Sequence, residues 1–449
     1  MRTLIKKLVP SGLFRKVEPY GHLVEAVIEE TIFGFPAKNI KVIGVTGTDG
    51  KTSTCTLVTQ MLRHAGFKVA MMTTISVDYG DGIEHDNPTR LTSLGSLQLI
   101  KELKKINTAG AQWLVLETTS HALAQHRVWG VPYTIGVMTN VGHEHLDYHG
   151  TFENYRDAKK MLFEHVNNNR RGLQVGIANA DDPSGALFAA AVKNPVLYGT
   201  KQGDLLAKDI KLTPSGSRYT AVVGADSYQI TCHLPGSFNV YNSLAAVGVG
   251  RAVGLTPEQI EQGIASLQSV EGRMTRVDEG QAFDVIVDYA HTPESFEKVM
   301  KEVRPLVKGR MFAVFGSAGR RDIEKRAAQG KVAGEQCDIV IATEEDDRDI
   351  DGYEILEQIA SGAREAGKIQ DKTLFLVHKR EDAIEKAFRM AEPGDMVLLL
   401  GKGHEKSILS NGPKAAEFHA RPQDDSDPER VIKRDYDEVL TARALLKSL

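Results

Sequence analysis

The sequence has few cysteines and no strong excess of charge of either sign. Its three cysteines, Cys55, Cys232 and Cys337, lie far apart among 449 residues and form no CxxC pair. This spacing supports neither a disulfide framework nor a thiolate zinc site, and it predicts a reducing, cytoplasmic location. The formal net charge is -4, so the chain lacks the basic excess of a dedicated nucleic-acid-binding protein.

Long hydrophobic runs are also missing. In the first 17 residues, MRTLIKKLVPSGLFRKV, five cationic side chains and a proline interrupt every apolar run. This pattern is typical of neither a signal peptide nor a membrane span. We favour a helix that packs on its own domain. The alternative is an amphipathic segment that makes weak peripheral contact with an anionic membrane surface.

Alternating strand and helix patterns are what the sequence does contain. A β-branched run at residues 40–45 is followed by Leu57, Val58, Met61 and Leu62 at helical spacing, up to Gly66. Further buried strands are predicted at residues 113–116, 134–139 and 173–178. They favour a parallel sheet, followed by an antiparallel subregion between residues 196 and 234.

A second strand-helix series follows residue 272. Its predicted strands lie near residues 285–287, 311–315, 339–343, 374–377 and 396–400. The expected fold class is therefore α/β, with a central P-loop parallel-sheet ATPase domain, a small antiparallel subregion and a Rossmann-like C-terminal domain. We predict a short N-terminal segment at 1–36, a central domain at 37–272 and a C-terminal domain at 273–449.

The strongest chemical signal is GVTGTDGKT at residues 44–52, between the first predicted strand and helix. Glycines let backbone amides approach phosphate oxygens, and the helix N-terminus, a lysine and a threonine hydroxyl add a dipole, a charge and a magnesium ligand. Val45 stands where the strict Walker pattern has glycine. The predicted phosphate-binding residues are Gly47, Thr48, Asp49, Gly50, Lys51, Thr52 and Ser53.

Two further features adjoin this loop at the carboxyl edge of the predicted sheet. Glu117 ends one strand and offers oxygen ligands for magnesium. His143, His145 and His149 follow the next strand, and taken alone they fit zinc ligation and plain hydrogen bonding equally well. The neighbouring phosphate loop favours magnesium chemistry.

Seven stretches, in this order, resemble the Mur ligase family, and within it the branch that adds diaminopimelate to a UDP-N-acetylmuramoyl dipeptide. They are GVTGTDGKTST, LETTSHALAQHRV, TNVGHEHLDYHGTFENYRDAKKMLF, GSFNVYNSLAA, EGRMTR, VDYAHTP and GKGHE. The resemblance covers the chain from about Lys41 to its C-terminus. It implies an ATP-dependent ligase that activates a carboxylate as an acyl phosphate and joins it to an amine.

The resemblance also implies roles for matching positions. Lys51 and Thr52 would hold ATP phosphates and a first magnesium ion, and Glu117 and His145 a second. Lys159 resembles the lysine that is carbamylated in this family; without the resemblance it would be a solvated charge on a helix. Asn242, Asp288 and His291 resemble nucleotide contacts, and Arg273 the arginine that reaches the terminal phosphate. A helix cap is the alternative for Asn242 and a turn residue for Asp288.

Substrate contacts follow in the same way. Near the muramoyl peptide the resemblance places Thr119, Ser120, Gln125 and Arg127, and near the incoming amino acid it places Arg348, Gly401 and Glu405. An arginine and a glutamate together can bind both distal groups of diaminopimelate. Asp346 and Asp347 stand where the family has Asn-Pro, inside an acidic run at 344–349 that favours a different pose of Arg348 or a purely cationic substrate.

The predicted function is ATP-dependent amide ligation in peptidoglycan precursor synthesis, by a monomer that acts on small molecules. Only about forty residues precede the phosphate loop, so the family's uridine-binding N-terminal domain is expected to be missing or reduced. Alternatives are a Mur-type ligase with a lipid-linked or polypeptide acceptor, one that adds lysine, and a non-catalytic nucleotide switch. A switch would need neither Lys159 nor His145.

Overall fold

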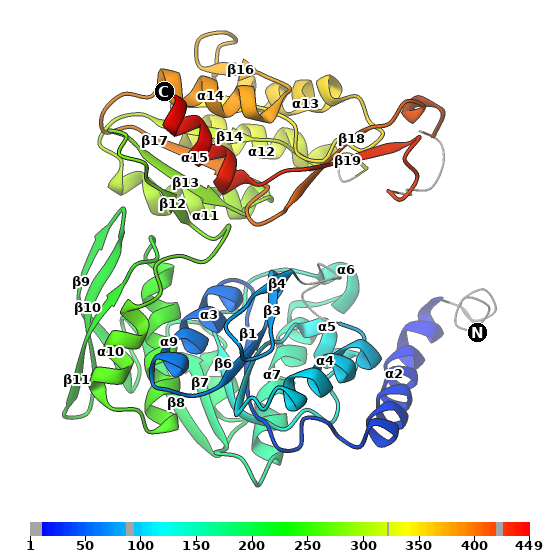
Figure 1. Cartoon of the computed structure of the whole chain (residues 1–449), viewed down its shortest axis with the longest axis vertical. Helices are drawn as coiled ribbons and strands as arrows, with labels where there is room; N and C mark the ends of the chain where they lie inside the picture. Colours follow the sequence, from blue (N-terminus) through cyan, green and yellow to red (C-terminus); the bar gives the residue numbers. More distant parts are fainter. Residues whose placement is uncertain (1–10, 87–93, 321–322, 419–424) are drawn as a thin grey trace. The chain divides into compact units, whose positions relative to one another are not determined.

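The computed structural model describes residues 11–86, 94–320, 323–418 and 425–449, and it divides into two compact units (Figure 1). Unit 1 comprises residues 1–211, 217–232 and 238–268, and unit 2 comprises 212–216, 233–237 and 269–449. Each unit is built on its own sheet. No helix among the described residues is long and apolar enough to cross a membrane.

Unit 1 contains an 11-stranded sheet with the order β11-β10-β9-β8-β7-β6-β1-β5-β2-β3-β4. The strands are β1 (Lys41–Thr46), β2 (Val69–Met72), β3 (Ser76–Asp78), β4 (His85–Asp86), β5 (Trp113–Glu117), β6 (Tyr133–Met138), β7 (Val175–Asn179), β8 (Asn194–Gly199), β9 (Leu205–Thr213), β10 (Gly216–Val223) and β11 (Asp226–Cys232). The central pairs are parallel, which confirms the predicted sheet. The β10–β11 pair is antiparallel, as expected for the subregion.

Helices cover both faces of this sheet. They are α2 (Ser11–Phe33), α3 (Lys51–His64), α4 (Ser96–Thr108), α5 (Ser120–Ala124), α6 (Leu146–His149), α7 (Phe152–Asn168), α8 (Gly185–Ala189), α9 (Phe238–Val253) and α10 (Pro257–Ala265). A Cβ on Gly176 would meet Phe163 of α7, whereas the next residue, Ile177, meets Gly248 of α9. Because successive strand residues face opposite sides, α7 and α9 lie on opposite faces.

The segment before β1 forms the helix α2, which packs against α4 of unit 1. This agrees with the favoured prediction of a helix packed on its own domain. Residues 1–10, on which part of that prediction rests, lie outside the described residues. The predicted apolar helix after the phosphate loop is confirmed as α3, with Leu57, Val58, Met61 and Leu62 all fully buried.

Unit 2 has a six-stranded sheet with the order β12-β13-β17-β14-β15-β16. The strands are β12 (Thr275–Val277), β13 (Asp284–Asp288), β14 (Met311–Phe315), β15 (Ile339–Ala342), β16 (Leu374–Leu376) and β17 (Met396–Leu400), and a small sheet pairs β18 (Ser407–Asn411) with β19 (Val431–Asp435). All pairs from β13 to β16 are parallel, and only β12 runs antiparallel in this sheet. All five predicted strands are present, so the Rossmann-like expectation is confirmed.

The helices of unit 2 alternate with its strands in the chain, as the pattern predicts, and α15 follows the last strand. They are α11 (Pro293–Val303), the 3-10 turns η1 (Arg304–Leu306) and η2 (Ala415–Phe418), α12 (Ile323–Gln336), α13 (Gly352–Glu365), α14 (Arg380–Met390) and α15 (Glu438–Ser448). Buried aliphatic and aromatic residues of the strands, α14 and α15 form a core that includes Val285, Phe312, Val397 and Phe388. The two units therefore have separate apolar cores.

Candidate active site

The phosphate loop joins β1 to α3, as the sequence predicts. Gly50 precedes the helix in a left-handed conformation with φ 79°, which glycine adopts at little cost. At Gly47 (φ 153°) a Cβ would lie 1.8 Å from Thr139 Oγ1, so no side chain fits there. The first amides of a 14-residue helix consequently face the loop, which is the arrangement that binds phosphate.

Residues after β6 hold this loop in place. The Thr48 amide donates to the Asn140 carbonyl at 2.9 Å, and the Asp49 amide donates to Asn140 Oδ1 at 3.0 Å. The Thr139 hydroxyl donates to the Asp49 carbonyl at 2.6 Å. Loop and strand ends are thus preorganised, so little rearrangement is needed for the amides to meet an anion.

Lys51 and Thr52 begin α3 and have different partners. The Lys51 ammonium donates to the Thr48 carbonyl at 2.8 Å, and the Thr52 hydroxyl donates to Glu117 Oε2 at 3.0 Å. Glu117 ends β5 and also accepts from the backbone amide and the hydroxyl of Thr74, each at 3.0 Å. A hydroxyl and a carboxylate therefore meet beside the loop, as predicted, and Thr74 is a contact that sequence reasoning missed.

Lys159 lies on the buried face of α7 and is only 2% exposed. Its ammonium donates to the Gly47 carbonyl at 2.6 Å and lies 4.6 Å from the centre of the Tyr155 ring. The alternative prediction of a solvated charge is therefore wrong, because the helix turns this residue towards the phosphate loop. Tyr155 was missed, although its spacing of four residues from Lys159 places both on one helix face.

Burial dominates the electrostatics of Lys159. It lowers the pKa of the ammonium well below its usual value, and the charge of Lys51 lowers it further. The carboxylates of Glu144, Asp49 and Glu117 oppose this shift without cancelling it. A neutral amine at this position is a nucleophile, whereas an ammonium is not.

The three histidines after β6 have separate surroundings. His143 stacks on Phe152 with ring centres 4.6 Å apart, and His149 Nε2 lies 3.1 Å from the Ser120 hydroxyl. His145 is exposed, precedes α6 with φ 55°, and faces the ring of His121 at 4.7 Å. Packing thus accounts for His143 and hydrogen bonding for His149. The ring centre of His145 lies 6.0 Å from that of Tyr155, the residue whose ring also contacts Lys159.

The predicted acceptor contacts cluster around α5. The Thr119 hydroxyl caps this helix by accepting from the Ala122 amide at 3.2 Å, and Gln125 follows the last helical residue. Gln125 is buried, and its Oε1 has no hydrogen-bond partner among the described residues. The structure brings Thr119, Ser120 and Gln125 together on one short helix and its caps. Arg127 follows this helix, and its backbone amide donates to the Ala122 carbonyl.

Asn242 lies inside α9, so the alternative of a helix cap is wrong. Its side chain accepts from the Thr54 hydroxyl at 3.3 Å and donates to Asn239 Oδ1 at 2.8 Å. A Cβ added at Gly50 would lie 2.4 Å from Asn242 Oδ1. The asparagine therefore adjoins the phosphate loop, although about 190 residues separate the two in the chain.

In unit 2 the predicted nucleotide contacts lie around the end of β13. Asp288 is buried and accepts from the amides of Met274 and Ala290, each at 2.8 Å; the second bond is the turn role weighed as its alternative. Burial raises the Asp288 pKa, and Arg273 opposes this. The Arg273 guanidinium lies 4.9 Å from the centre of the Tyr289 ring, and its buried Nε has no partner among the described residues.

His291 is held by its own turn. Its Nδ1 lies 3.0 Å from the Tyr289 carbonyl, and burial lowers the pKa of the ring. The neutral imidazole is therefore the form that the surroundings favour near pH 7. Gly401, which follows β17, adopts φ 100° and donates its amide to the Asp288 carbonyl at 3.2 Å.

The two charged residues predicted to contact the amino acid, Arg348 and Glu405, each pair with a side chain of opposite charge. Arg348 is 7% exposed, and its guanidinium donates to Asp425 at 3.1 Å and to the Gly319 carbonyl at 2.9 Å. Glu405 accepts from Lys402 at 2.6 Å, and burial raises its pKa. Lys402 also donates to Asp346 at 3.0 Å. Sequence reasoning missed Asp425 and the pairing of Lys402 with Asp346, because these partners are 77 and 56 residues apart in the chain.

Comparison with known proteins agrees with this geometry. Residues 45–250 match the Mur ligase middle domain, and residues 272–403 match the Mur ligase glutamate ligase domain. A UDP-N-acetylmuramyl-tripeptide synthetase of Roseiflexus sp. (strain RS-1) is 40% identical over 403 residues, which cover 87% of this chain and 79% of that protein. The chain belongs to the Mur ligase family.

Members of this family are ATP-dependent ligases that form peptide bonds, and so is this chain. A Mur ligase relative in Geobacillus thermodenitrificans, a UDP-N-acetylmuramoyl-L-alanyl-D-glutamate--2,6-diaminopimelate ligase, is 37% identical over 87% of this chain and 79% of its own length. A solved structure of a ligase with that name superimposes with a TM-score of 0.64 at 27% identity, over 92% of this chain and 79% of the other.

Proposed function

We propose that this Mur ligase adds a diamino acid, with meso-diaminopimelate preferred, to the glutamate carboxylate of UDP-N-acetylmuramoyl-L-alanyl-D-glutamate. The proposal is supported by relatives at 37–40% identity whose names state tripeptide synthesis or diaminopimelate ligation. The observation that carries it is Lys159, buried against the Gly47 carbonyl of the phosphate loop. A simple ATPase or nucleotide switch has no need of a second buried amine at this place.

The reaction consists of two transfers. The acceptor carboxylate attacks the terminal phosphorus of ATP, an oxygen–phosphorus bond forms, and ADP leaves. The amine then attacks the carbonyl carbon of the acyl phosphate, loses a proton, and displaces inorganic phosphate to leave the amide. Lys51 lowers the repulsion between the acceptor carboxylate and the triphosphate, because its ammonium lies at the loop that binds the phosphates.

Magnesium is part of the proposal. Thr52 and Glu117 fit the ion, because a hydroxyl and a carboxylate 3.0 Å apart offer the hard oxygen ligands that it prefers. His145 and a carbamylated Lys159 would complete the ligands of two ions. When bound, the ions supply positive charge beside the phosphates. Asn242, Arg273, Asp288 and His291 remain predicted nucleotide contacts.

A carbamate on Lys159 has a specific physical basis here. Burial favours the neutral amine, which can attack carbon dioxide at carbon and lose a proton to form a carbamate. The product is an oxygen anion in place of a cation, beside a site that needs oxygen ligands. Carbon-13 NMR of the chain supplied with labelled bicarbonate should show one carbamate signal, which Lys159→Met removes.

The proposed reaction is tested by measuring ADP release and product mass. The acceptor is supplied with diaminopimelate, with lysine or with no amine, and each reaction is repeated without the acceptor. We expect ADP release to require the acceptor and the tripeptide mass to appear with diaminopimelate. Release that is unchanged without the acceptor would contradict the substrate assignment.

A matched pair of variants isolates Lys159. Lys159→Ala should lower ligation about 100-fold or more, because a preorganised electrostatic group at the reacting phosphate is lost. Lys160→Ala removes the neighbouring lysine of the same helix, which pairs with Glu164 at 3.1 Å on the partly exposed side, and should leave ligation unchanged. Equal losses in both variants would point to a general effect on α7 instead.

A lysine-adding ligase is the second candidate for the amino acid. It is favoured by the engagement of Arg348 with Asp425 and Gly319, since this guanidinium must exchange partners before it binds a distal carboxylate. Lysine has no such carboxylate. The ratio of kcat/KM for diaminopimelate and lysine decides between the two.

A further inference from the structure

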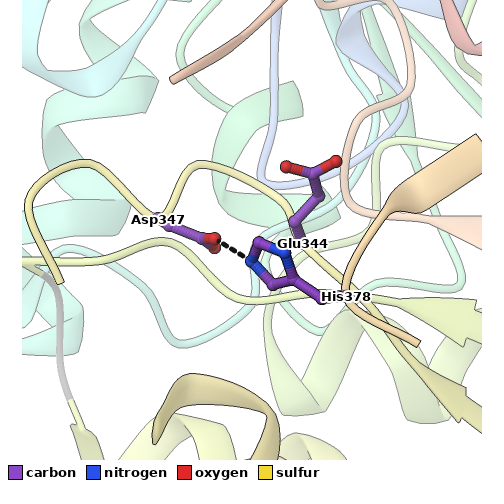
Figure 2. Close-up of side chains that lie close together, drawn as sticks. All are labelled: Glu344, Asp347 and His378. Carbon is purple, nitrogen blue, oxygen red and sulfur yellow. Dashed lines mark hydrogen bonds and ion pairs between the residues drawn. The ribbon is translucent and has the colours of Figure 1, made fainter. Parts of the chain in front are cut away.

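Three side chains that commonly bind metal ions gather in unit 2. Glu344 and Asp347 follow β15, and His378 follows β16 (Figure 2). These strands are parallel neighbours with Ala342 opposite Leu376, so both loops leave the same carboxyl edge of the sheet. One ligand atom from each of the three residues lies within 4.8 Å of the other two.

The arrangement is built into the fold. The Asp347 and Glu344 side chains are 4% and 5% exposed, whereas His378 is 33% exposed and keeps the group open to solvent. His378 Nε2 lies 2.6 Å from Asp347 Oδ2, and the exposed ring of Tyr353 stacks on the imidazole at 5.2 Å. A Cβ on Gly352 would lie 2.0 Å from His378 Nε2, so a glycine at the start of α13 leaves the space for this pair.

In each buried carboxylate, the hydrogen bonds seen among the described residues leave one oxygen available to bind a cation. Asp347 Oδ1 is buried without a hydrogen-bond partner among the described residues, although the residue is only 3% exposed. The described bonds of the Glu344 carboxylate, from the Arg380 amide at 3.1 Å and from Arg434, both go to Oε1. Leaving a buried charged oxygen without a partner is unfavourable, and a bound cation removes that cost.

We propose that Glu344, Asp347 and His378 bind one divalent transition-metal ion of the manganese-to-zinc series. One imidazole nitrogen and two carboxylate oxygens are a set that suits these ions, whereas magnesium prefers oxygen ligands alone. The ion replaces the proton between His378 Nε2 and Asp347 Oδ2, and that proton leaves to solvent. Ligand bonds of about 2.0–2.2 Å require His378 Nε2 and Asp347 Oδ2, which are 2.6 Å apart, to separate slightly and the Glu344 carboxylate to approach them.

The bound ion has a structural consequence within unit 2. The ion joins two loops. Glu344 and Asp347 lie on the loop that carries Arg348, and His378 lies on the loop that leads into α14. The site uses none of the residues assigned to the ligase reaction. It is therefore a second cation site, independent of the magnesium ions proposed beside the phosphate loop.

Metal binding to the tag-free, nucleotide-free full chain tests the site. After dialysis against a chelator, zinc is titrated and counted by mass spectrometry, and cobalt is used as an optical probe of its ligands. We expect one ion per chain. Loss of a residue that only supports a metal ligand lowers affinity about 10–100-fold. His378→Ala removes a ligand and should weaken zinc binding by more than this, and Asp347→Asn should also weaken it. His64→Ala, which removes an exposed histidine of unit 1 beside Gln262, is the matched control and should leave binding unchanged.

Three results would overturn the proposal. They are the absence of a stoichiometric ion, an equal affinity in His378→Ala and the unaltered chain, and a loss in His64→Ala with retention in His378→Ala. The last two would place the ion elsewhere, and the first would mean that a protonated His378 simply pairs with Asp347. Should His378→Ala fail to fold, as judged by circular dichroism, the near-isosteric Asp347→Asn and Glu344→Gln variants decide in the same way.

Discussion

The two units differ in the partners of the lysine and arginine side chains at their candidate sites. In unit 1, Lys51 and Lys159 donate to the carbonyls of Thr48 and Gly47, and neither forms an ion pair with a carboxylate among the described residues. In unit 2, Arg348 and Lys402 donate directly to Asp425, Asp346 and Glu405. The first arrangement leaves the positive charge of Lys51 uncompensated, while the second neutralises positive charge within the protein.

This difference determines how much free energy an anionic ligand gains when it binds at each candidate site. A phosphate that approaches Lys51 competes only with a neutral carbonyl, so most of the electrostatic gain goes to the ligand. A substrate carboxylate that approaches Arg348 must displace the carboxylate of Asp425. The net free energy of binding is then only the difference between two similar ion pairs. We therefore expect unit 1 to contribute mainly affinity, and unit 2 to contribute discrimination between similar ligands.

Lys51→Met should give the largest effect, because it removes uncompensated charge at the phosphate loop. We expect ligation, followed as ADP release, to fall about 10³-fold or more with the fold intact. Lys101→Met, the same substitution at an exposed position of α4, serves as the control and should change nothing. Full activity in Lys51→Met would end the contrast between the units.

Unit 2 should instead lose stability when its ion pairs are broken. Arg380 and Glu438 are 2.6 Å apart with fully buried side chains. Glu438→Gln leaves a buried guanidinium without its charge partner and should lower the free energy of unfolding by about 3–5 kcal/mol, measured by urea denaturation. Glu385→Gln breaks the exposed pair with Arg389 and should cost about 0.5 kcal/mol or less. Similar losses in the two variants would contradict this account.

Glu30 offers a third test, because it is a buried acid of unit 1 whose two carboxyl oxygens have no partner among the described residues. Burial raises its pKa to about 7 from the ordinary 4.5. Between these values the folded state holds the proton more tightly than the unfolded chain. Stability should therefore fall as pH rises through this window, by up to about 3 kcal/mol at about 1.4 kcal/mol per pKa unit.

Glu30→Gln should remove this pH dependence and stabilise unit 1 above pH 7. Both tryptophans of the chain, Trp113 and Trp129, lie in unit 1, so their fluorescence during urea unfolding at pH 5 and pH 8 reports on the relevant unit. The control is Glu25→Gln on the same helix, where the side chain is 49% exposed. This variant should leave the pH dependence of stability unchanged. A pH slope that survives in Glu30→Gln would assign it to other groups.

The sequence predicted the strands and the phosphate loop well because both depend on local pattern. Apolar runs gave all five parallel strands of unit 2, and glycine spacing marked the turns at Gly47 and Gly50. The interior helical position of Asn242 and the burial of Lys159 were not predictable from residue type. Each depends on how a helix is rotated against the sheet, which distant residues determine.

Long-range partners explain what was missed in unit 2. Asp425 is 77 residues from Arg348, Lys402 is 56 residues from Asp346, and His378 is 31 residues from Asp347. The acidic run at 344–349 was noticed as a departure from the family, but its partners could not be read from the chain. Parallel strand order places these loops together, and that order emerges only in the folded sheet.

Asp425→Asn should have the smallest effect, and it asks whether the pairing in unit 2 sets amino-acid preference. Asp425 is 31% exposed, so its pairing with Arg348 is worth about 0.2–1 kcal/mol. If a distal carboxylate displaces it, the variant should lower KM for diaminopimelate about two- to fivefold and leave KM for lysine unchanged, because lysine offers no group to the released guanidinium. An equal change for both amino acids would mean that Asp425 orders the loop generally. In that case discrimination would have to arise from other charged groups, of which Asp346, Lys402 and Glu405 form one ion-paired cluster.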